Sequence, residues 1–330
     1  MKKLLKIFSM IIGVIIILLL IAFSYLQMSY PSVPPAEELT IDYSQERIER
    51  GAYLANHVTV CMDCHSARDF SYFSGPPTPG TLGRGGDRFD HSMGFPGVFY
   101  AKNITPTGIS QYSDGELYRV ITTGVTHDDR AMFPLMPYMY YGKMDPEDIY
   151  DIIAYIRSLD PLPSQIPDSE ADFPVNLILN TIPQEAQPQK KPNSSDQVAY
   201  GAYLVNAGGC IECHTQVNEQ GMIIPEKAFA GGRDFLFPDG SKVTSSNITS
   251  DPETGIGNWT SEQFIDRFKQ YSDSTYLREK VKPGDFNTIM PWIMYSGMKE
   301  EDLRAIFSYL KTLPPQKNQI IRFTAASQTP

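Results

Sequence analysis

Two pentapeptides hold all four cysteines of this 330-residue chain. The first is CMDCH, which ends at His65, and the second is CIECH, which ends at His214. Two thiols at this spacing can each add to one vinyl group of a porphyrin, and the histidine that follows can bind the iron, so the motif is typical of haem attachment. The sequence therefore predicts two covalently bound haem c groups, with His65 and His214 as iron ligands and four attachment residues: Cys61, Cys64, Cys210 and Cys213.

Other cysteine chemistries fit this pattern less well. A zinc site made from two C-x-x-C pairs has them about 15–20 residues apart, whereas these pairs lie in separate halves of the chain. A redox-active disulfide needs no histidine and expects a βαβ context, which the sequence does not show. An iron–sulfur cluster needs four cysteines together. A structural disulfide remains open in an exported chain, but one that closes so short a loop would stabilise little.

The two motifs lie in longer segments that recur in the same order. RGAYLANHVTVCMDCH (50–65) parallels YGAYLVNAGGCIECH (200–214). Further on, LMPYMYYGKMDPEDIYDIIAYIRSL (135–159) parallels IMPWIMYSGMKEEDLRAIFSYLKTL (289–313), and GGDRF and KNITP return as GGRDF and SNITS. Two copies at so long a period indicate a duplicated domain of about 120 residues, each copy large enough to fold.

The sixth iron ligand must come from elsewhere in each copy. The second copy has one histidine, His214, so its distal ligand is not a histidine of the same domain. Met290 in IMPW aligns with Met136 in LMPY, and a thioether opposite histidine gives the Met/His ligation that raises the potential. We therefore predict Met136 and Met290 as metal ligands. Four other methionines are predicted to fill the core: Met139, Met144, Met294 and Met298.

Other side chains are weaker candidates for contacts with the haems. Arg88 and Arg233 follow the matched glycine pairs, and Asn103 and Asn247 open the matched NIT turns. A guanidinium can pair with a haem propionate and an amide can donate to one. Ordinary turn chemistry explains the same residues equally well. His57 and His91 remain open as ligands, and His127 is predicted at the surface.

The sequence pattern predicts helices around each motif and no strong strand. Asp145 is a good N-cap, and isoleucines at helical spacing follow it. A further helix is expected after Ser113 in the first copy and after Thr260 in the second. Gly51 and Gly201 recur before the motifs, where a glycine lets a second helix cross closely. The remaining segments are long Gly- and Pro-rich loops, which are unusual unless they wrap around something. The fold class expected is therefore all-α.

The N-terminus predicts a membrane anchor at residues 1–30. Three lysines precede an uncharged run from 7 to 26, which is about long enough to cross a bilayer as one helix. The lysines would hold the N-terminus in the cytoplasm and place the rest outside. A cleaved signal peptide is the alternative.

Charge and composition divide the rest of the chain. We expect a first domain at 31–160, a Pro-rich linker at 161–196, a second domain at 197–320 and a tail at 321–330. Their net charges are −8 for the first domain, −3 for the linker and −2 for residues 197–330, against −10 overall. This acidity argues against nucleic acid as a partner and favours a basic protein partner at the first domain.

These segments together resemble membrane-anchored dihaem cytochromes c. Each copy is similar to a class I cytochrome c domain, with a helix leading into CxxCH, loops, a Met–Pro segment and a C-terminal helix. NITSDPETGIGNWTSEQF and MPWIMYSGMKEEDLRAIFSYLKTLPP are similar to the cytochrome c subunits of periplasmic alcohol, aldehyde and sugar-acid dehydrogenases. The resemblance implies an all-α tandem duplication behind one transmembrane helix. It also implies a single-pass protein of the cytoplasmic (inner) membrane with its globular part in the periplasm or cell exterior.

The resemblance further implies an electron-transfer protein with no catalytic residues. It would accept electrons from a dehydrogenase or quinol-oxidising complex and pass them to an oxidase or soluble carrier. A dihaem peroxidase is the alternative, but it needs one open distal site, and the matched Met–Pro segments count against it. A haem sensor is disfavoured because a sensor needs one haem. Two departures concern the partner: those subunits often carry three haem domains, and the first copy has its own insert, RDFSYFSGPPTPGTLGRGGDRFDHSMG.

Overall fold

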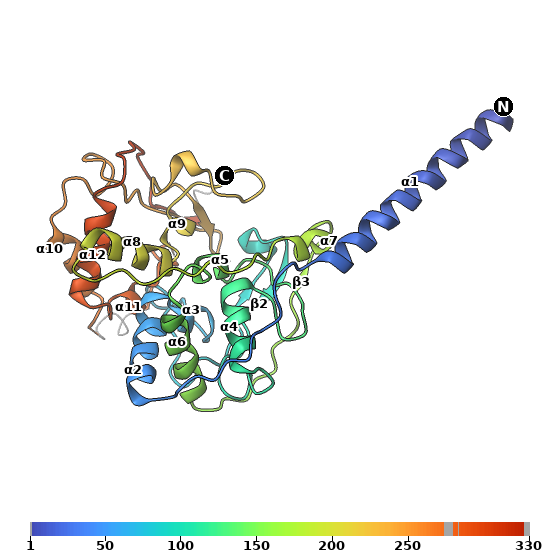
Figure 1. The fold of residues 1–330 in the computed structure, drawn as a ribbon. Coiled ribbons are helices and arrows are strands. Elements are labelled where there is room, and N and C mark those ends of the chain that lie inside the picture. Colours follow the sequence, from blue (N-terminus) through green and yellow to red (C-terminus); the bar gives the residue numbers. More distant parts are fainter. Residues whose placement is uncertain (1, 274–279, 283, 327–330) are drawn as a thin grey trace.

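The structure is a computed structural model, and it describes residues 2–273, 280–282 and 284–326. Helix α1 (Lys2–Ser29) extends away from a body that holds the rest of the described chain (Figure 1). No residue of α1 is buried, and it is long and apolar enough to cross a membrane, a property that signal sequences share. It covers the uncharged run from 7 to 26.

The body contains two similar series of elements joined by a connecting segment. The first half (residues 31–160) contains α2 (Gln45–Tyr53), the π-helix η1 (Leu54–Val58), α3 (Cys61–Cys64), β1 (Arg88–Phe89), η2 (His91–Met93), β2 (Gly97–Tyr100), α4 (Asp114–Thr123), α5 (Tyr138–Tyr141) and α6 (Pro146–Ser158). The connecting segment contains β3 (Glu170–Ala171), α7 (Val175–Ile178) and η3 (Leu179–Thr181). The second half (residues 197–326) contains α8 (Gln197–Ala207), α9 (Cys210–Cys213), η4 (Pro225–Lys227), β4 (Asp234–Leu236), β5 (Lys242–Thr244), α10 (Ser261–Lys269), α11 (Trp292–Tyr295), α12 (Glu300–Leu310) and β6 (Phe323–Thr324).

Capping side chains set the starts of the predicted helices. A capping box of Ser113 and Glu116 begins α4, and one of Thr260 and Gln263 begins α10. In each box the side chains and backbone N–H groups of both residues satisfy one another. The carboxylate of Asp145 caps α6 in the same position. The structure confirms these three predicted starts.

In each half, the first and last helices cross at a glycine. At Gly51, where α2 meets α6, an added Cβ would lie 1.8 Å from the backbone oxygen of Asp151. At Gly201, where α8 meets α12, it would lie 1.9 Å from that of Ala305. Only a residue without a side chain permits such an approach. The predicted packing contact is therefore confirmed in both halves.

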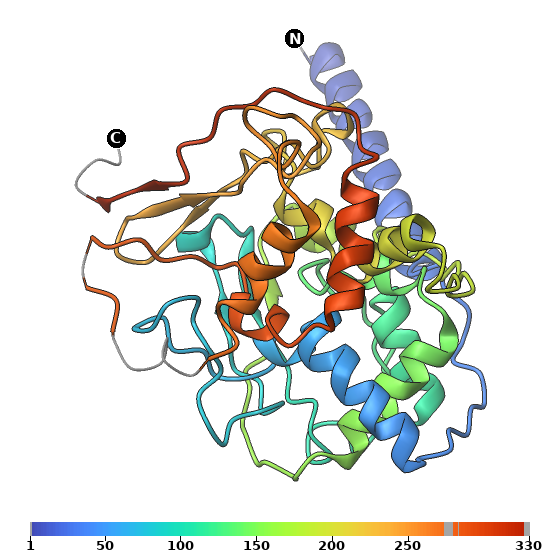
Figure 2. The same cartoon turned by 90° about the vertical axis from the view of Figure 1, so that its left-hand side faces the viewer.

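Two small sheets correct the expectation of an all-α fold. Strands β1, β2 and β3 form one antiparallel sheet, and β4, β5 and β6 form the other, with β6 supplied by the C-terminal segment (Figure 2). Each strand has only two to four residues. Such short strands show no alternating pattern over enough residues to be distinguished from loops. The fold is mainly helical, with two short sheets among its loops.

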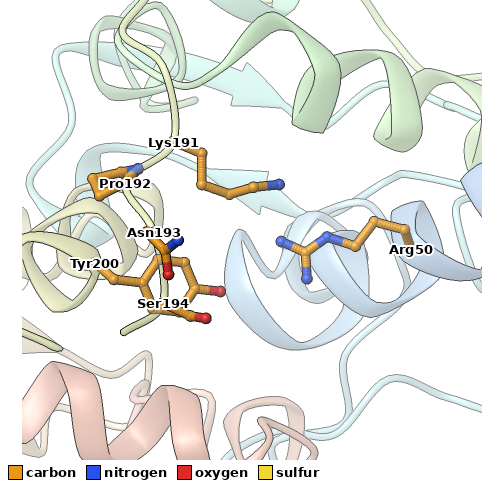
Figure 3. Close-up of a pocket in the computed structure, with 6 residues that line it drawn as sticks. All are labelled: Arg50, Lys191, Pro192, Asn193, Ser194 and Tyr200. Atoms are coloured by element: carbon orange, nitrogen blue, oxygen red, sulfur yellow. The ribbon is translucent and has the colours of Figure 1, made fainter. Parts of the chain in front are cut away.

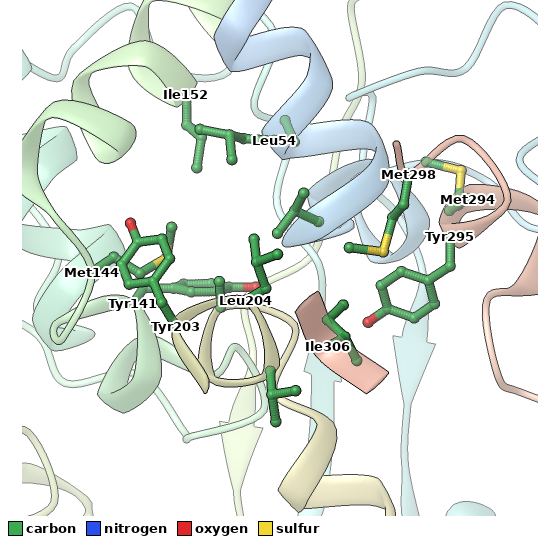
Figure 4. Packing of buried hydrophobic residues seen from close by; sticks show 14 of the residues in the cluster. Leu54, Tyr141, Met144, Ile152, Tyr203, Leu204, Met294, Tyr295, Met298 and Ile306 are labelled. Carbon is green, nitrogen blue, oxygen red and sulfur yellow. The ribbon is translucent and has the colours of Figure 1, made fainter. Parts of the chain in front are cut away.

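One hydrophobic core joins the two halves. Its buried residues include Leu54, Tyr141 and Ile152 from the first half and Leu204, Tyr295 and Ile306 from the second (Figure 4). Burying such a side chain stabilises the fold by about 1.5–3 kcal/mol. Because the cluster is continuous, the halves are docked against each other as one body.

Matched tyrosines also connect the two halves. The hydroxyl of Tyr53 on α2 donates to Asp302 on α12 at 2.5 Å, and that of Tyr203 on α8 donates to Asp148 on α6 at 2.7 Å. Each hydroxyl also accepts a backbone N–H from the residue that precedes the other half's last helix, Lys299 or Asp145. Each tyrosine therefore ties the first helix of its own half to the last helix of the other.

Candidate haem sites

Each CxxCH motif forms one short helix after a left-handed residue. Val60 (φ 46°) precedes α3 and Gly209 (φ 59°) precedes α9. In both, the N–H of the motif histidine donates to the carbonyl of the first cysteine at 3.0 Å. All four cysteines are free thiols. The two motifs therefore have the same backbone form, and neither uses its thiols in a disulfide.

The two motif histidines make the same hydrogen bond. Nδ1 of His65 lies 2.6 Å from the carbonyl oxygen of Lys102, and Nδ1 of His214 lies 2.7 Å from that of Ser246. A carbonyl can only accept, so Nδ1 carries the proton and Nε2 keeps its lone pair. Burial lowers the pKa of both imidazoles, which favours the neutral form that binds metals. Both histidines are therefore held in the tautomer that leaves Nε2 unprotonated.

The matched glycine pairs hold the segments that carry these acceptor carbonyls close to the motif histidines. The N–H of Gly85 donates to the carbonyl of His65, and that of Gly231 donates to the carbonyl of His214, each at 2.8 Å. Both glycines have positive φ, and a Cβ there would lie 2.6 Å or less from the backbone of Lys102 or Ser246. These two carbonyls were not predicted from the sequence, although the matched glycine pair and the later KN (102–103) and SN (246–247) recur in both copies and could have indicated them.

Asn103 and Asn247 form turns beside these carbonyls. The Oδ1 of each accepts the N–H two residues on, at 2.9 Å. The Nδ2 of Asn103 donates to Leu162 and that of Asn247 to Gln316, both at 2.7 Å to backbone oxygens. These are the turn contacts that the sequence left as the alternative to a propionate contact.

The two predicted arginines lie in different surroundings. Arg233 contacts the second motif, since its NH1 donates to the backbone oxygen of Glu212 and lies 3.4 Å from that side chain's Oε2. Arg88 is more than half exposed and pairs with Asp90 at 3.0 Å. The repeat therefore places one of the two arginines, Arg233, against its motif.

Arg68 makes the corresponding contact in the first half. Its NH1 lies 2.9 Å from Oδ2 of Asp63, which occupies the motif position of Glu212, and both side chains are 7% exposed. Burial raises the pKa of Asp63 to about 6, and Arg68 acts in the opposite direction. Sequence reasoning missed Arg68 because the aligned residue in the second copy is Val217.

A buried tyrosine ties each Met–Pro segment to its own motif. Tyr141, five residues after Met136, donates to the carbonyl of Thr59 at 3.1 Å, and Thr59 is two residues before the first motif. Tyr295, five residues after Met290, donates to Gly208 at the same distance. These two tyrosines were not predicted, although they align in the repeat. Met136 and Met290 are both partly buried and pack against the core.

The other methionines and histidines named from the sequence lie in the core or make contacts of their own, with one exception. Met144, Met294 and Met298 are buried as predicted, but Met139 is 40% exposed, which corrects its assignment to the core, because its position on α5 faces outward. His91 pairs with Asp172 at 2.6 Å, and His127 packs edge-on against Tyr112.

His57 lies in η1 and contacts the other half. The first copy has one residue more than the second between its glycine and its first cysteine, and η1 lies within this stretch. The Nδ1 of His57 donates to the carbonyl of Met294 at 2.7 Å. In the other half, Nδ2 of Asn206 donates to the matching carbonyl of Tyr140 at 2.9 Å. The first helix of each half therefore binds the short helix after the other half's Met–Pro segment.

A separate cavity of about 380 Å³ lies where the connecting segment ends. Figure 3 shows the side chains of Arg50 and Lys191 that line it, together with Tyr200. The same two cations pair with buried Asp148, at 3.4 and 2.6 Å. No motif residue is among the described residues that line this cavity. Its two cations form ion pairs with Asp148.

The donor groups at both motifs fit haem c. Each motif supplies two free thiols at the attachment spacing, and an imidazole whose Nε2 is free. A methionine segment is tied to each motif by a tyrosine. These are the thioether-forming and axial groups that haem c requires.

The comparisons with known proteins point to the same class. Residues 198–314 match the cytochrome c family. The match covers most of the second half, which is therefore similar to a cytochrome c domain.

Relatives extend the likeness to most of the chain. The chain is 27% identical over 296 residues to the cytochrome c subunit of the quinone alcohol dehydrogenase of Gluconacetobacter polyoxogenes, covering 84% of this chain and 58% of that protein. It is 28% identical over 301 residues to the gluconate 2-dehydrogenase cytochrome c subunit of Pantoea cypripedii, covering 85% and 63%. It is 27% identical over 265 residues to a diheme cytochrome c-type protein of Cereibacter sphaeroides, covering 77% and 82%. The chain is thus similar to cytochrome c subunits of dehydrogenases, and it spans less than two thirds of the length of the first two.

Proposed function

We propose that the chain is a dihaem cytochrome c that transfers electrons between redox proteins. Cys61, Cys64 and His65 would hold one haem c, and the second motif would hold the other. The observation that carries the proposal is the matched bond from each motif histidine's Nδ1 to a backbone carbonyl, which leaves Nε2 for iron in both halves. Bound haem c supplies one-electron redox chemistry at its iron.

The two halves are proposed to be a tandem duplication of a class I cytochrome c domain, at 31–160 and 197–320. Support comes from contacts made by aligned residues: the glycine crossings, the histidine bonds and the tyrosine bonds. The cytochrome c match covers the second half, and one relative is named as a diheme protein.

Met136 and Met290 are proposed as the residues that, together with the two motif histidines, would bind the haem irons. Each stands before a proline, and each is followed by a short helix whose tyrosine bonds the backbone next to the motif of the same half. The tyrosine hydrogen bond thus keeps the methionine segment near the motif. Arg233 is positioned to fix the second motif through Glu212, as Arg68 fixes the first through Asp63.

The N-terminal helix is proposed to anchor the protein in the cytoplasmic membrane, with the body in the periplasm or cell exterior. Support comes from its length, its apolar composition and the lysines at its start. The partners are proposed to be a dehydrogenase or quinol-oxidising complex as donor, and an oxidase or soluble carrier as acceptor. The relatives named as subunits of alcohol and gluconate dehydrogenases support the donor class. The net charge of −8 on the first half favours a basic partner surface there.

Counting covalent haems tests this proposal. The denatured full-length protein should keep its haem absorbance and give two haems per chain in a pyridine haemochrome assay. The double variant Cys61→Ala/Cys64→Ala should keep one haem, and Cys210→Ala/Cys213→Ala should keep the other. Removal of all haem from the unmutated protein by acid–acetone would refute covalent attachment. Rapid peroxide-dependent oxidation of a reduced donor by the unmutated protein would favour a peroxidase instead.

A further inference from the structure

Part of the insert in the first half packs on the Met290 loop of the second half. The N–H of Val281 donates to the carbonyl of Ser71 at 2.8 Å, and Tyr72 forms a β-bridge with Lys280. The ring of Phe73 lies 6.0 Å from that of Phe286. The segment 70–75 therefore runs beside the described residues that lead up to Met290.

Ser74 makes the contacts closest to the methionine. Its Oγ donates to the carbonyl oxygen of Met290 at 2.5 Å and accepts the N–H of Trp292 at 3.0 Å. One hydroxyl thus bridges the backbone on both sides of Pro291. Ser74 is 1% exposed, so water does not replace these bonds if the hydroxyl is lost.

Asn287 completes the contact from the side of the second half. Its Oδ1 accepts the N–H of Ser74 at 3.0 Å, and its Nδ2 donates to the carbonyl of Phe70 at 3.0 Å. The same Oδ1 accepts the N–H of Thr288, whose hydroxyl accepts the N–H of Met290 at 3.1 Å. Both the N–H and the carbonyl of Met290 are therefore held by this buried network.

The backbone of Ser74 lies in a region that glycine normally occupies. Its φ is 66°, and that of Gly75 is 55°. A side chain at positive φ costs free energy, and such strain persists where the surroundings fix it. Glycine would remove the strain but would also remove the hydroxyl that bridges Met290 and Trp292.

Arg68 connects this segment to the first motif. Its Nε donates to the carbonyl of Gly75 at 3.1 Å, its NH2 donates to that of Ser74 at 3.3 Å, and its NH1 pairs with Asp63 at 2.9 Å. The turn that holds Met290 is therefore attached to a residue that lies between Cys61 and Cys64.

We propose that segment 70–75 of the first half clamps the Met290 loop, and that Ser74 is the positioning residue that holds Met290 for binding to the second iron. This inference rests on the proposed function, since it requires a haem at the second motif and Met290 as its ligand. A methionine sulfur bonds ferric iron weakly, so ligation depends on how firmly its loop is held. The state of the second site is thereby set by residues of the first half.

The test uses the full-length protein in detergent. It measures the weak sulfur-to-iron charge-transfer band of the oxidised form, and the two midpoint potentials by redox titration. In a Met136→Ala background, the remaining band reports on the second site. There, Ser74→Gly should remove most of that band and lower the second potential. In a Met290→Ala background, Ser74→Gly should leave the remaining band unchanged. Pyridine haemochrome should still count two haems in every variant.

Two further variants separate positioning from a general loss of structure. Ser71→Ala is the matched control, because Ser71 contacts the second half through its backbone carbonyl. The charge-transfer band of this variant should equal that of the unmutated protein. Asn287→Ala removes the same network from the other side and should weaken the band in part, even if Ser74→Gly folds poorly.

The possible outcomes distinguish the clamp from the assignment of Met290 as a ligand. If Met290→Ala alters the band and one potential while Ser74→Gly and Asn287→Ala alter neither, the clamp is refuted and the ligand assignment stands. If Met290→Ala itself changes neither, the ligand assignment is wrong and the clamp is refuted with it. An equal effect of Ser74→Gly in both backgrounds would show a general structural role and would also overturn the proposal.

Discussion

The loops that carry Met136 and Met290 have similar sequences and the same local form, but they are held differently. In each, a carbonyl before proline accepts the N–H two residues on, and a four-residue helix follows. The Met290 carbonyl also accepts a bond from Ser74 of the first half. In the described part of the chain, no residue of the second half makes the equivalent bond to Met136. The comparison shows that an internal repeat can conserve a local site while tertiary contacts make its copies unequal.

The largest expected effect separates the two methionines. Met136→Ala and Met290→Ala should each open one iron, so cyanide affinity should rise at that site by about tenfold or more, equivalent to about 1.4 kcal/mol or more. In the unmutated protein, cyanide should bind first at the Met136 site, because that loop lacks the clamp. Optical titration in the two single variants assigns each phase. Binding first at the Met290 site would contradict the proposed difference between the loops.

The glycine crossings should show that the halves are alike in their packing. Gly51→Ala and Gly201→Ala each place a Cβ within 2 Å of a backbone oxygen on the crossing helix, which cannot move aside independently. We expect each to lower the free energy of unfolding by about 1–3 kcal/mol or more. Urea denaturation measures the loss. Gly13→Ala in α1 is the control and should have little effect, because beyond the helix's own backbone and the two neighbouring residues no atom lies within 4 Å of the added Cβ. If Gly201→Ala left the free energy of unfolding unchanged while Gly51→Ala lowered it, the two halves would not be packed alike.

The two interface tyrosines should differ in strength. Tyr53→Phe leaves buried Asp302 without its 2.5 Å bond, whereas after Tyr203→Phe the carboxylate of Asp148 keeps Arg50 and Lys191. Asp302 keeps the neighbouring Tyr200 hydroxyl, whereas Asp148 keeps two cations. A buried acceptor that loses a partner costs about 1–3 kcal/mol, so the free energy of unfolding should fall more for Tyr53→Phe than for Tyr203→Phe. The same urea denaturation ranks them. Equal losses would show that the cations do not compensate Asp148.

The smallest expected effect is on alkaline stability. Burial, with Asp302 or Asp148 nearby, raises the pKa of Tyr53 and Tyr203 above the ordinary value of about 10. A raised pKa in the folded state contributes stability that is fully present below pH 10 and is lost as pH rises above it. The free energy of unfolding of the unmutated protein should therefore fall more steeply above about pH 10 than that of Tyr203→Phe. Parallel curves for the two proteins would show that this hydroxyl does not carry the effect.

Much of the local structure was predictable from the sequence. The helix starts at Ser113, Asp145 and Thr260 and the crossings at Gly51 and Gly201 were confirmed. These features depend on residues within a few positions of each other, or on a side chain that glycine lacks. The assignment of Met290 rests on a repeat that can be read along the chain, and it stays a prediction.

Other parts of the candidate site could not have been predicted in this way. Arg68 aligns with Val217, and Ser74 lies in a part of the insert without a counterpart, so the repeat gave no signal for either residue. The short sheets were missed because two to four residues are too few to show alternation. Arg88 was matched to Arg233 by sequence, yet it contacts Asp90 rather than its motif.

The sequence by itself determined two CxxCH motifs, the helices that lead into and follow them, and an apolar N-terminal helix. Covalent spacing and local capping are sufficient for these, because the groups involved are near each other along the chain. Only the tertiary structure decided that Ser74 bonds Met290, more than 200 residues away. It also decided that the hydroxyls of Tyr53 and Tyr203 each bind an aspartate on the last helix of the other half. Those bonds form only once the shared core has docked the two halves, since no local preference brings such distant residues together.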